Sequence, residues 1–81
     1  MFCAYVLRSE ANGRLYKGSC GNLDIRLQQH NSGKVRSTRP FRPWILVHSE
    51  TFPTRSEAFH REQHWKTVEG AKELKGILTS A

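Results

Sequence analysis

Two ionisable side chains fall on the apolar face of the first helix that the sequence predicts. Leu23 and Leu27 mark the stripe of this helix that must be buried. Arg26 and His30 lie three or four residues from these leucines and therefore share their face. A guanidinium and an imidazole would thus point toward the sheet rather than toward solvent.

A carboxylate is placed in the same way on the second predicted helix. Ala58, Phe59 and Trp65 mark its inward face, and Glu62 lies between them. Burying a lone charge costs several kcal/mol, so the three ionisable groups should meet one another, a metal ion or a cleft. The pattern leaves a functional site and a purely structural role equally open, the latter being either an ion pair between Arg26 and Glu62 or charged ends that reach the rim.

Two tyrosines, Tyr5 and Tyr16, lie on either side of Asn12-Gly13, a strong signal for a β-hairpin. With the turn centred on this pair or one residue earlier, both tyrosines share one face of the sheet. In the earlier register Tyr16 opposes Leu7, a diagonal neighbour of Tyr5. A register halfway between these two would put the tyrosines on opposite faces of the sheet. Simple packing is also the more common role of aromatic residues on strands.

The elements that must position these groups follow from periodicity and capping signals. Asn22 and Thr54 are expected N-caps, and Gly33 and Gly70 are expected to end or interrupt helices. The apolar start of the third strand suggests that it is buried on both faces. The expected elements are strands 2–8 and 15–18, a helix from Asn22 to about Asn31 or Ser32, a strand 44–52, a helix from Thr54 to about Val68, and a last amphipathic stretch after Gly70.

This order predicts an α+β fold, a three-stranded antiparallel sheet flanked by helices in the order β-β-α-β-α-α. With 81 residues, the chain is long enough for one domain, 1–81, and too short for two.

The chain is basic, with 13 Lys and Arg against seven Asp and Glu and a formal charge of +6. Such an excess favours a polyanionic partner, although charge can also merely keep a protein dispersed. Pro40 and Pro43 exclude a helix from a loop that carries four cations and no acid. This loop is either a phosphate-binding segment or a solvated one, and its cations are Lys34, Arg36, Arg39 and Arg42.

Cys3 and Cys20 lack the spacing of a metal site and are expected to be free thiols in a reducing compartment. No apolar run approaches the ~18 residues of a membrane span, so we expect no membrane partner and a cytoplasmic protein. His48, His60 and His64 are expected to be surface or packing residues.

Five segments in this order resemble the GIY-YIG nuclease superfamily, and in particular its small stand-alone members, which are similar to the N-terminal nuclease domain of a bacterial excinuclease. Cys3 and Ala4 stand where the first motif usually has Gly and Ile, and Lys17 replaces an aliphatic residue of the second motif. The segments are Cys-Ala-Tyr-Val with Tyr5, Leu-Tyr-Lys-Gly with Tyr16 and Gly18, residues 22–33, Arg42-Pro43-Trp44, and Ser56-Glu57-Ala58 leading to Glu62 and Lys66.

The resemblance implies hydrolysis of a DNA phosphodiester bond by in-line attack of water, with Mg²⁺ or Mn²⁺ as cofactor. Glu62 would be the one protein ligand of the metal ion, and Arg26 would brace the phosphoryl oxygens. The general base is left open between Tyr5 and His30, with Tyr16 orienting water or phosphate. The residues expected to contact DNA are Lys17, Lys34, Arg36, Arg39, Arg42 and Lys66.

The expected function is therefore a DNA endonuclease of low sequence specificity in DNA repair or processing. A monomer is favoured over a dimer, and a repair protein is a conceivable second partner. The alternatives are a non-catalytic nucleic-acid binding module and an interaction domain of a repair complex with the same fold.

Overall fold

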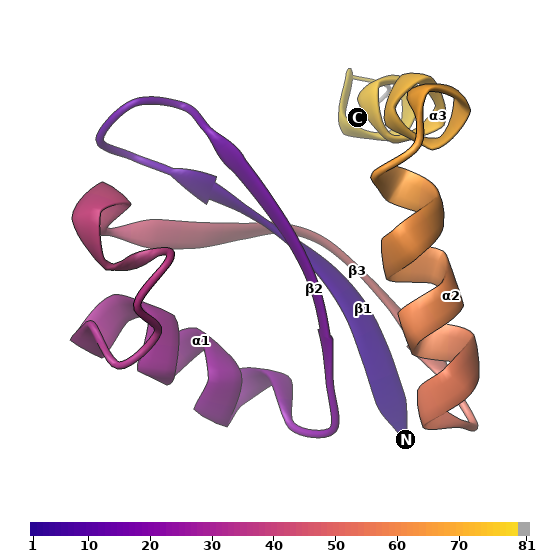
Figure 1. Ribbon diagram of the computed structural model, residues 1–81, viewed down its shortest axis with the longest axis horizontal. Coiled ribbons are helices and arrows are strands. Elements are labelled where there is room, and N and C mark those ends of the chain that lie inside the picture. Colours follow the sequence, from indigo (N-terminus) through magenta and orange to yellow (C-terminus); the bar gives the residue numbers. More distant parts are fainter. Residues whose placement is uncertain (80–81) are drawn as a thin grey trace.

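A three-stranded antiparallel sheet organises the computed structural model, which describes residues 1–79 (Figure 1). The strand order is β2-β1-β3, so β1 is central and pairs with both neighbours. The elements are β1 (Phe2–Ser9), β2 (Leu15–Cys20), α1 (Leu23–Ser32), the 3₁₀ turn η1 (Arg39–Phe41), β3 (Trp44–Phe52), α2 (Arg55–Trp65) and α3 (Val68–Thr79). This is the predicted α+β fold with the predicted element order; the last two residues of the predicted domain lie outside the described part.

The β1–β2 hairpin has the earlier of the two registers considered. Leu7 pairs with Tyr16 and Tyr5 with Gly18, so Tyr5 and Tyr16 lie on the same face of the sheet. The turn closes through the amide of Ser9, which donates to the carbonyl of Arg14 at 2.8 Å. The register that brings the two phenols together is thus confirmed.

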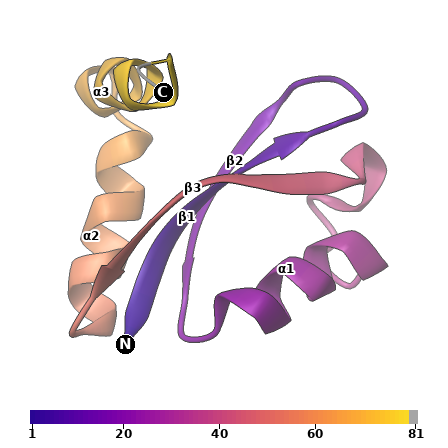
Figure 2. The same cartoon turned by 180° about the vertical axis from the view of Figure 1, so that it is seen from behind.

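The two faces of the sheet carry separate apolar clusters. One cluster contains Tyr5, Leu7 and Trp44 and packs against α1, while the other contains Val6 and Trp65 and packs against α2 and α3. Figures 1 and 2 show α1 on one side of the sheet and α2 with α3 on the other. Arg26 and His30 therefore belong to a helix on the opposite side of the sheet from Glu62.

The predicted caps of α1 and α2 are confirmed. The side chain of Asn22 accepts from the amide of Ile25, and Thr54 accepts from the amide of Glu57 at 3.2 Å. Gly33 ends α1 in the left-handed conformation, with φ of 85°.

The end of α2 differs from the prediction. The helix stops at Trp65 rather than near Val68, and Gly70 lies inside α3 instead of interrupting a helix. Thr67 makes the break, because its hydroxyl donates to the carbonyl of His64 and accepts from the amide of Gly70. A Cβ on Gly70 would collide with the carbonyl oxygen of His64, so glycine is needed here for α2 and α3 to approach this closely.

Three other expectations about apolar residues and proline are wrong. Ile45 is 37% and Leu46 40% exposed, because β3 is an edge strand of a domain too small to cover it on both sides. Phe59, expected to face inward, is 48% exposed. Pro40 lies inside η1, at its first turn, where the missing amide hydrogen of proline has no helical partner to lose.

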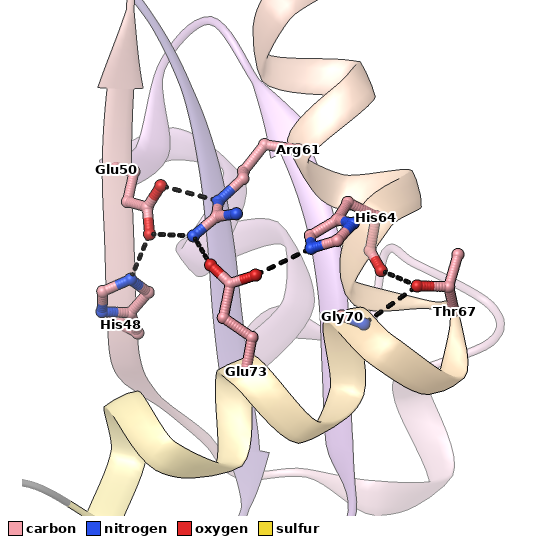
Figure 3. A network of polar contacts seen from close by, with 7 residues as sticks. All are labelled: His48, Glu50, Arg61, His64, Thr67, Gly70 and Glu73. Atoms are coloured by element: carbon pink, nitrogen blue, oxygen red, sulfur yellow. Dashed lines mark hydrogen bonds and ion pairs between the residues drawn. The ribbon is translucent and has the colours of Figure 1, made fainter.

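A network of charged residues ties α3 to α2 and β3 (Figure 3). Arg61 of α2 pairs with Glu50 of β3 at 2.9 Å and with Glu73 of α3 at 2.8 Å. His48 also pairs with Glu50, and His64 also pairs with Glu73, so both histidines belong to this network. Within residues 1–79, no helix has the length and apolar character needed to cross a membrane.

Candidate active site

A buried chain of hydrogen bonds joins β1, α1 and the loop before β3. The hydroxyl of Tyr5 lies 3.0 Å from Nε2 of His30, whose Nδ1 lies 2.8 Å from Oγ1 of Thr38. Their exposed fractions are 1%, 0% and 1%. Because the Thr38 hydroxyl donates to the carbonyl of Val35, its oxygen accepts from Nδ1–H, and Nε2 accepts from the phenol.

Burial also fixes the protonation of these two groups. Burial raises the pKa of Tyr5, against the opposing effect of the Arg26 guanidinium. Burial, together with the charge of Arg26, lowers the pKa of His30 to about 4. At neutral pH, Tyr5 is thus a protonated donor and His30 a neutral acceptor.

Two half-buried side chains, Tyr16 and Arg26, lie on the solvent side of the buried Tyr5–His30 pair. The ring of Tyr16 lies 4.9 Å from that of His30 and 6.3 Å from that of Tyr5, between ring centroids. Interaction with the Tyr5 hydroxyl is the largest cause that raises the pKa of Arg26, and Tyr16 contributes in the same direction. Tyr16 and Arg26 are therefore the members of the group that solvent and a ligand can reach.

The glycine of the second motif is explained by packing. Gly18 pairs with Tyr5 across the strands, and a Cβ there would lie 2.5 Å from Cζ and the hydroxyl oxygen of Tyr5. Only a residue without a side chain lets the phenol cross the strand to reach His30.

Glu62 is nearly buried on the other side of the sheet. Its Oε1 accepts from the hydroxyl of Ser19 at 2.7 Å, and its Oε2 accepts from Nζ of Lys66 at 2.7 Å and from the side-chain amide of Gln63. The alternative of an Arg26–Glu62 ion pair is not what the structure contains, since the pair is Lys66–Glu62.

The C-terminal end of edge strand β2 links the two halves. Ser19 holds Glu62 on the α2 side, and the next residue, Cys20, faces the other way. Burial raises the pKa of Cys20 to about 12, and among the opposing effects is the charge of Arg26. The structure thus groups Tyr5, Tyr16, Arg26 and His30, and places Glu62 across this strand end.

The predicted cationic residues lie in three places. The four cations of the loop, Lys34, Arg36, Arg39 and Arg42, are all exposed. Arg39 and Arg42 also bend back to donate to the carbonyls of Gly33 and Arg39 at 2.7 and 3.0 Å. Lys17 alternates with Tyr16 and so faces the α2–α3 side, and Lys66 is paired with Glu62.

Sequence reasoning missed Ser19, Thr38 and the Asn31–Trp44 pair. Asn31 accepts from the amide of Trp44 at 2.6 Å and donates to its carbonyl at 3.0 Å, which fixes the end of α1 against β3. Strand alternation could have placed Ser19 on the face of the sheet opposite Tyr16, but not beside Glu62. No local pattern predicts the position of Thr38, because it depends on the path of the loop.

Comparison with known families agrees with this geometry. The family model described as the GIY-YIG catalytic domain matches residues 1–75, and the chain belongs to this family.

Individual relatives are UPF0213 proteins. One from Staphylococcus haemolyticus is 38% identical over 74 residues, covering 90% of this chain and 89% of its own length. One from Staphylococcus epidermidis is 40% identical over 74 residues, with the same coverage. The solution structure of a UPF0213 protein from Bacillus halodurans superposes with a TM-score of 0.56 at 30% identity, covering 95% of this chain and 85% of that one.

Proposed function

We propose that this protein is a metal-dependent endonuclease that hydrolyses DNA phosphodiester bonds with little sequence specificity. One observation carries the proposal: an accessible phenol and guanidinium, Tyr16 and Arg26, lie before a buried Tyr5–His30 pair, with the Glu62 carboxylate across the end of β2. Family membership supports the same chemistry. We further expect a monomer that works in the cytoplasm, in DNA repair or processing.

The roles follow from accessibility. Arg26 binds the phosphoryl oxygens, because its planar fork of donors matches them. Tyr16 orients the attacking water, since its hydroxyl is the accessible one. Tyr5 and His30, which the sequence left as alternative bases, are positioning residues, because their polar atoms are buried and already paired.

The oxygen donors fit a magnesium-class ion held by one carboxylate. Among residues 1–79, no group of three or more His, Cys, Asp or Glu side chains could hold a metal ion. Mg²⁺ and Mn²⁺ tolerate a single carboxylate, because waters and phosphate oxygens complete their coordination. Glu62 would hold the ion after the half-exposed Lys66 head leaves Oε2, and the ion would stabilise charge on the leaving oxygen.

Cleavage assays on branched, flapped and linear DNA, with and without Mg²⁺ or Mn²⁺, test the proposal. We expect metal-dependent nicking by the native protein, and its loss in Glu62→Gln with fold and DNA affinity kept. Binding without cleavage would instead indicate a non-catalytic module. Absence of both would indicate a protein-interaction domain.

A further inference from the structure

A hollow of about 490 Å³ opens beside the candidate metal ligand, on the α2 side of the sheet. We call it the α2 pocket, and it is lined by Ser19, Arg55, Ser56 and Phe59. Ser19 belongs to both places, because it lines the α2 pocket and its hydroxyl donates to Oε1 of Glu62. The α2 pocket is therefore continuous with the proposed site without containing any residue given a catalytic role.

Phe59 is an aromatic residue without a role in the apolar core. It is 48% exposed, and neither apolar cluster of the described residues includes it. Its closest aromatic neighbour is His60 on the same helix, at 6.4 Å between centroids. Phe59 precedes Glu62 by three residues, so it lies one helical turn from the carboxylate. A flat apolar surface is thus presented next to the proposed reaction centre.

The polar residues that line the α2 pocket are one cation, Arg55, and two neutral serines. Arg55 lies with its Cζ 4.9 Å from the centre of the Phe2 ring and is in no ion pair among residues 1–79. The lining contains no acid. An aromatic platform with an adjacent cation suits a nucleotide, because bases stack on aromatic rings and phosphates pair with arginine.

We propose that the α2 pocket binds an unpaired nucleobase that flanks the scissile phosphate, stacked on Phe59, with Arg55 on the adjoining backbone phosphate. The inference rests on the proposed function and deepens it. A side chain can stack on a base face only when that base has left the duplex stack. The pocket therefore selects DNA that is single-stranded beside the cut, such as flaps and branches.

The test compares binding of a single-stranded oligothymidylate and of a duplex, by fluorescence anisotropy in the presence of EDTA. We expect Phe59→Ala to weaken single-strand binding by about 10- to 100-fold and to leave duplex binding unchanged, with Phe59→Trp restoring it. Val68→Ala, at an apolar side chain 75% exposed on α3, is the matched control and should change neither.

The outcomes separate the two proposals. Unchanged single-strand binding by Phe59→Ala, or an equal loss for both DNA forms, overturns the base pocket while native cleavage leaves the nuclease standing. A native protein that binds neither DNA form overturns both. Thermal melting of each variant confirms that binding is compared between folded proteins.

Discussion

The Tyr5 hydroxyl donates to Nε2 of His30 across 3.0 Å, and both side chains are buried beneath Tyr16. Tyr5 therefore supports the site from inside the core, whereas Tyr16 lies at the surface of the site. The two tyrosines should therefore respond differently to the same substitution.

Tyr5→Phe should destabilise the fold by about 1–3 kcal/mol, because Nε2 of His30 then has no donor in a buried site. Tyr16→Phe should change stability by less than about 1 kcal/mol, because Tyr16 is half-exposed, yet it should lower cleavage by at least about 10-fold. Urea unfolding and cleavage rates measure the two effects. A Tyr16→Phe variant as active as native protein would remove Tyr16 from the reaction.

His30 should make the protein acid-sensitive. Its pKa falls from 6.5 to about 4 on folding, so its neutral form stabilises the fold fully above pH 6.5. As pH drops from 6.5 to 4, up to about 3 kcal/mol is lost, because the unfolded chain binds the proton first. His30→Gln should flatten unfolding free energy over this range. The same slope in that variant would assign the effect to another group.

Local patterns were enough for the fold and for part of the site. The caps at Asn22, Gly33 and Thr54 are short-range features, and strand alternation brought Tyr5 and Tyr16 to one face. The contacts of Glu62 were not predictable in this way. Helical periodicity says that a side chain points toward the sheet but not which face of the sheet its helix covers, and that depends on tertiary packing.

The junction of α2 and α3 offers a matched pair of glycines. Gly70→Ala should destabilise by more than about 2 kcal/mol, because the new methyl group collides with the His64 carbonyl and one helix must move. Gly76 lies in the same helix with open space around it, so Gly76→Ala should stabilise by about 0.5–1 kcal/mol. Urea midpoints of the two variants should move in opposite directions. Equal shifts would show that α3 packs differently.

Arg61 should be the main electrostatic attachment of α3. Burial works against ionisation of Glu50, but Arg61 and His48 together hold the pKa of Glu50 below its usual value. Hydrogen bonds from His64 and then from Arg61 lower the pKa of Glu73. Arg61→Met keeps an apolar stem but removes the guanidinium, whose Cζ lies 5.2 Å from the centre of the Trp65 ring. It also leaves Glu50 and Glu73 without their shared cation (Figure 3). We expect a loss of about 1–2 kcal/mol at pH 7 and low salt.

The salt dependence of this loss identifies its cause. Ionic screening weakens partly exposed pairs, so the difference between native protein and Arg61→Met should shrink in about 1 M NaCl. Lys72→Met removes an exposed charge from α3 and should stay within about 0.5 kcal/mol of native protein at either salt concentration. A loss in Arg61→Met that is unchanged by salt would point to packing against Trp65. The attachment of α3 would then be apolar, through Leu74 and its neighbours, rather than ionic.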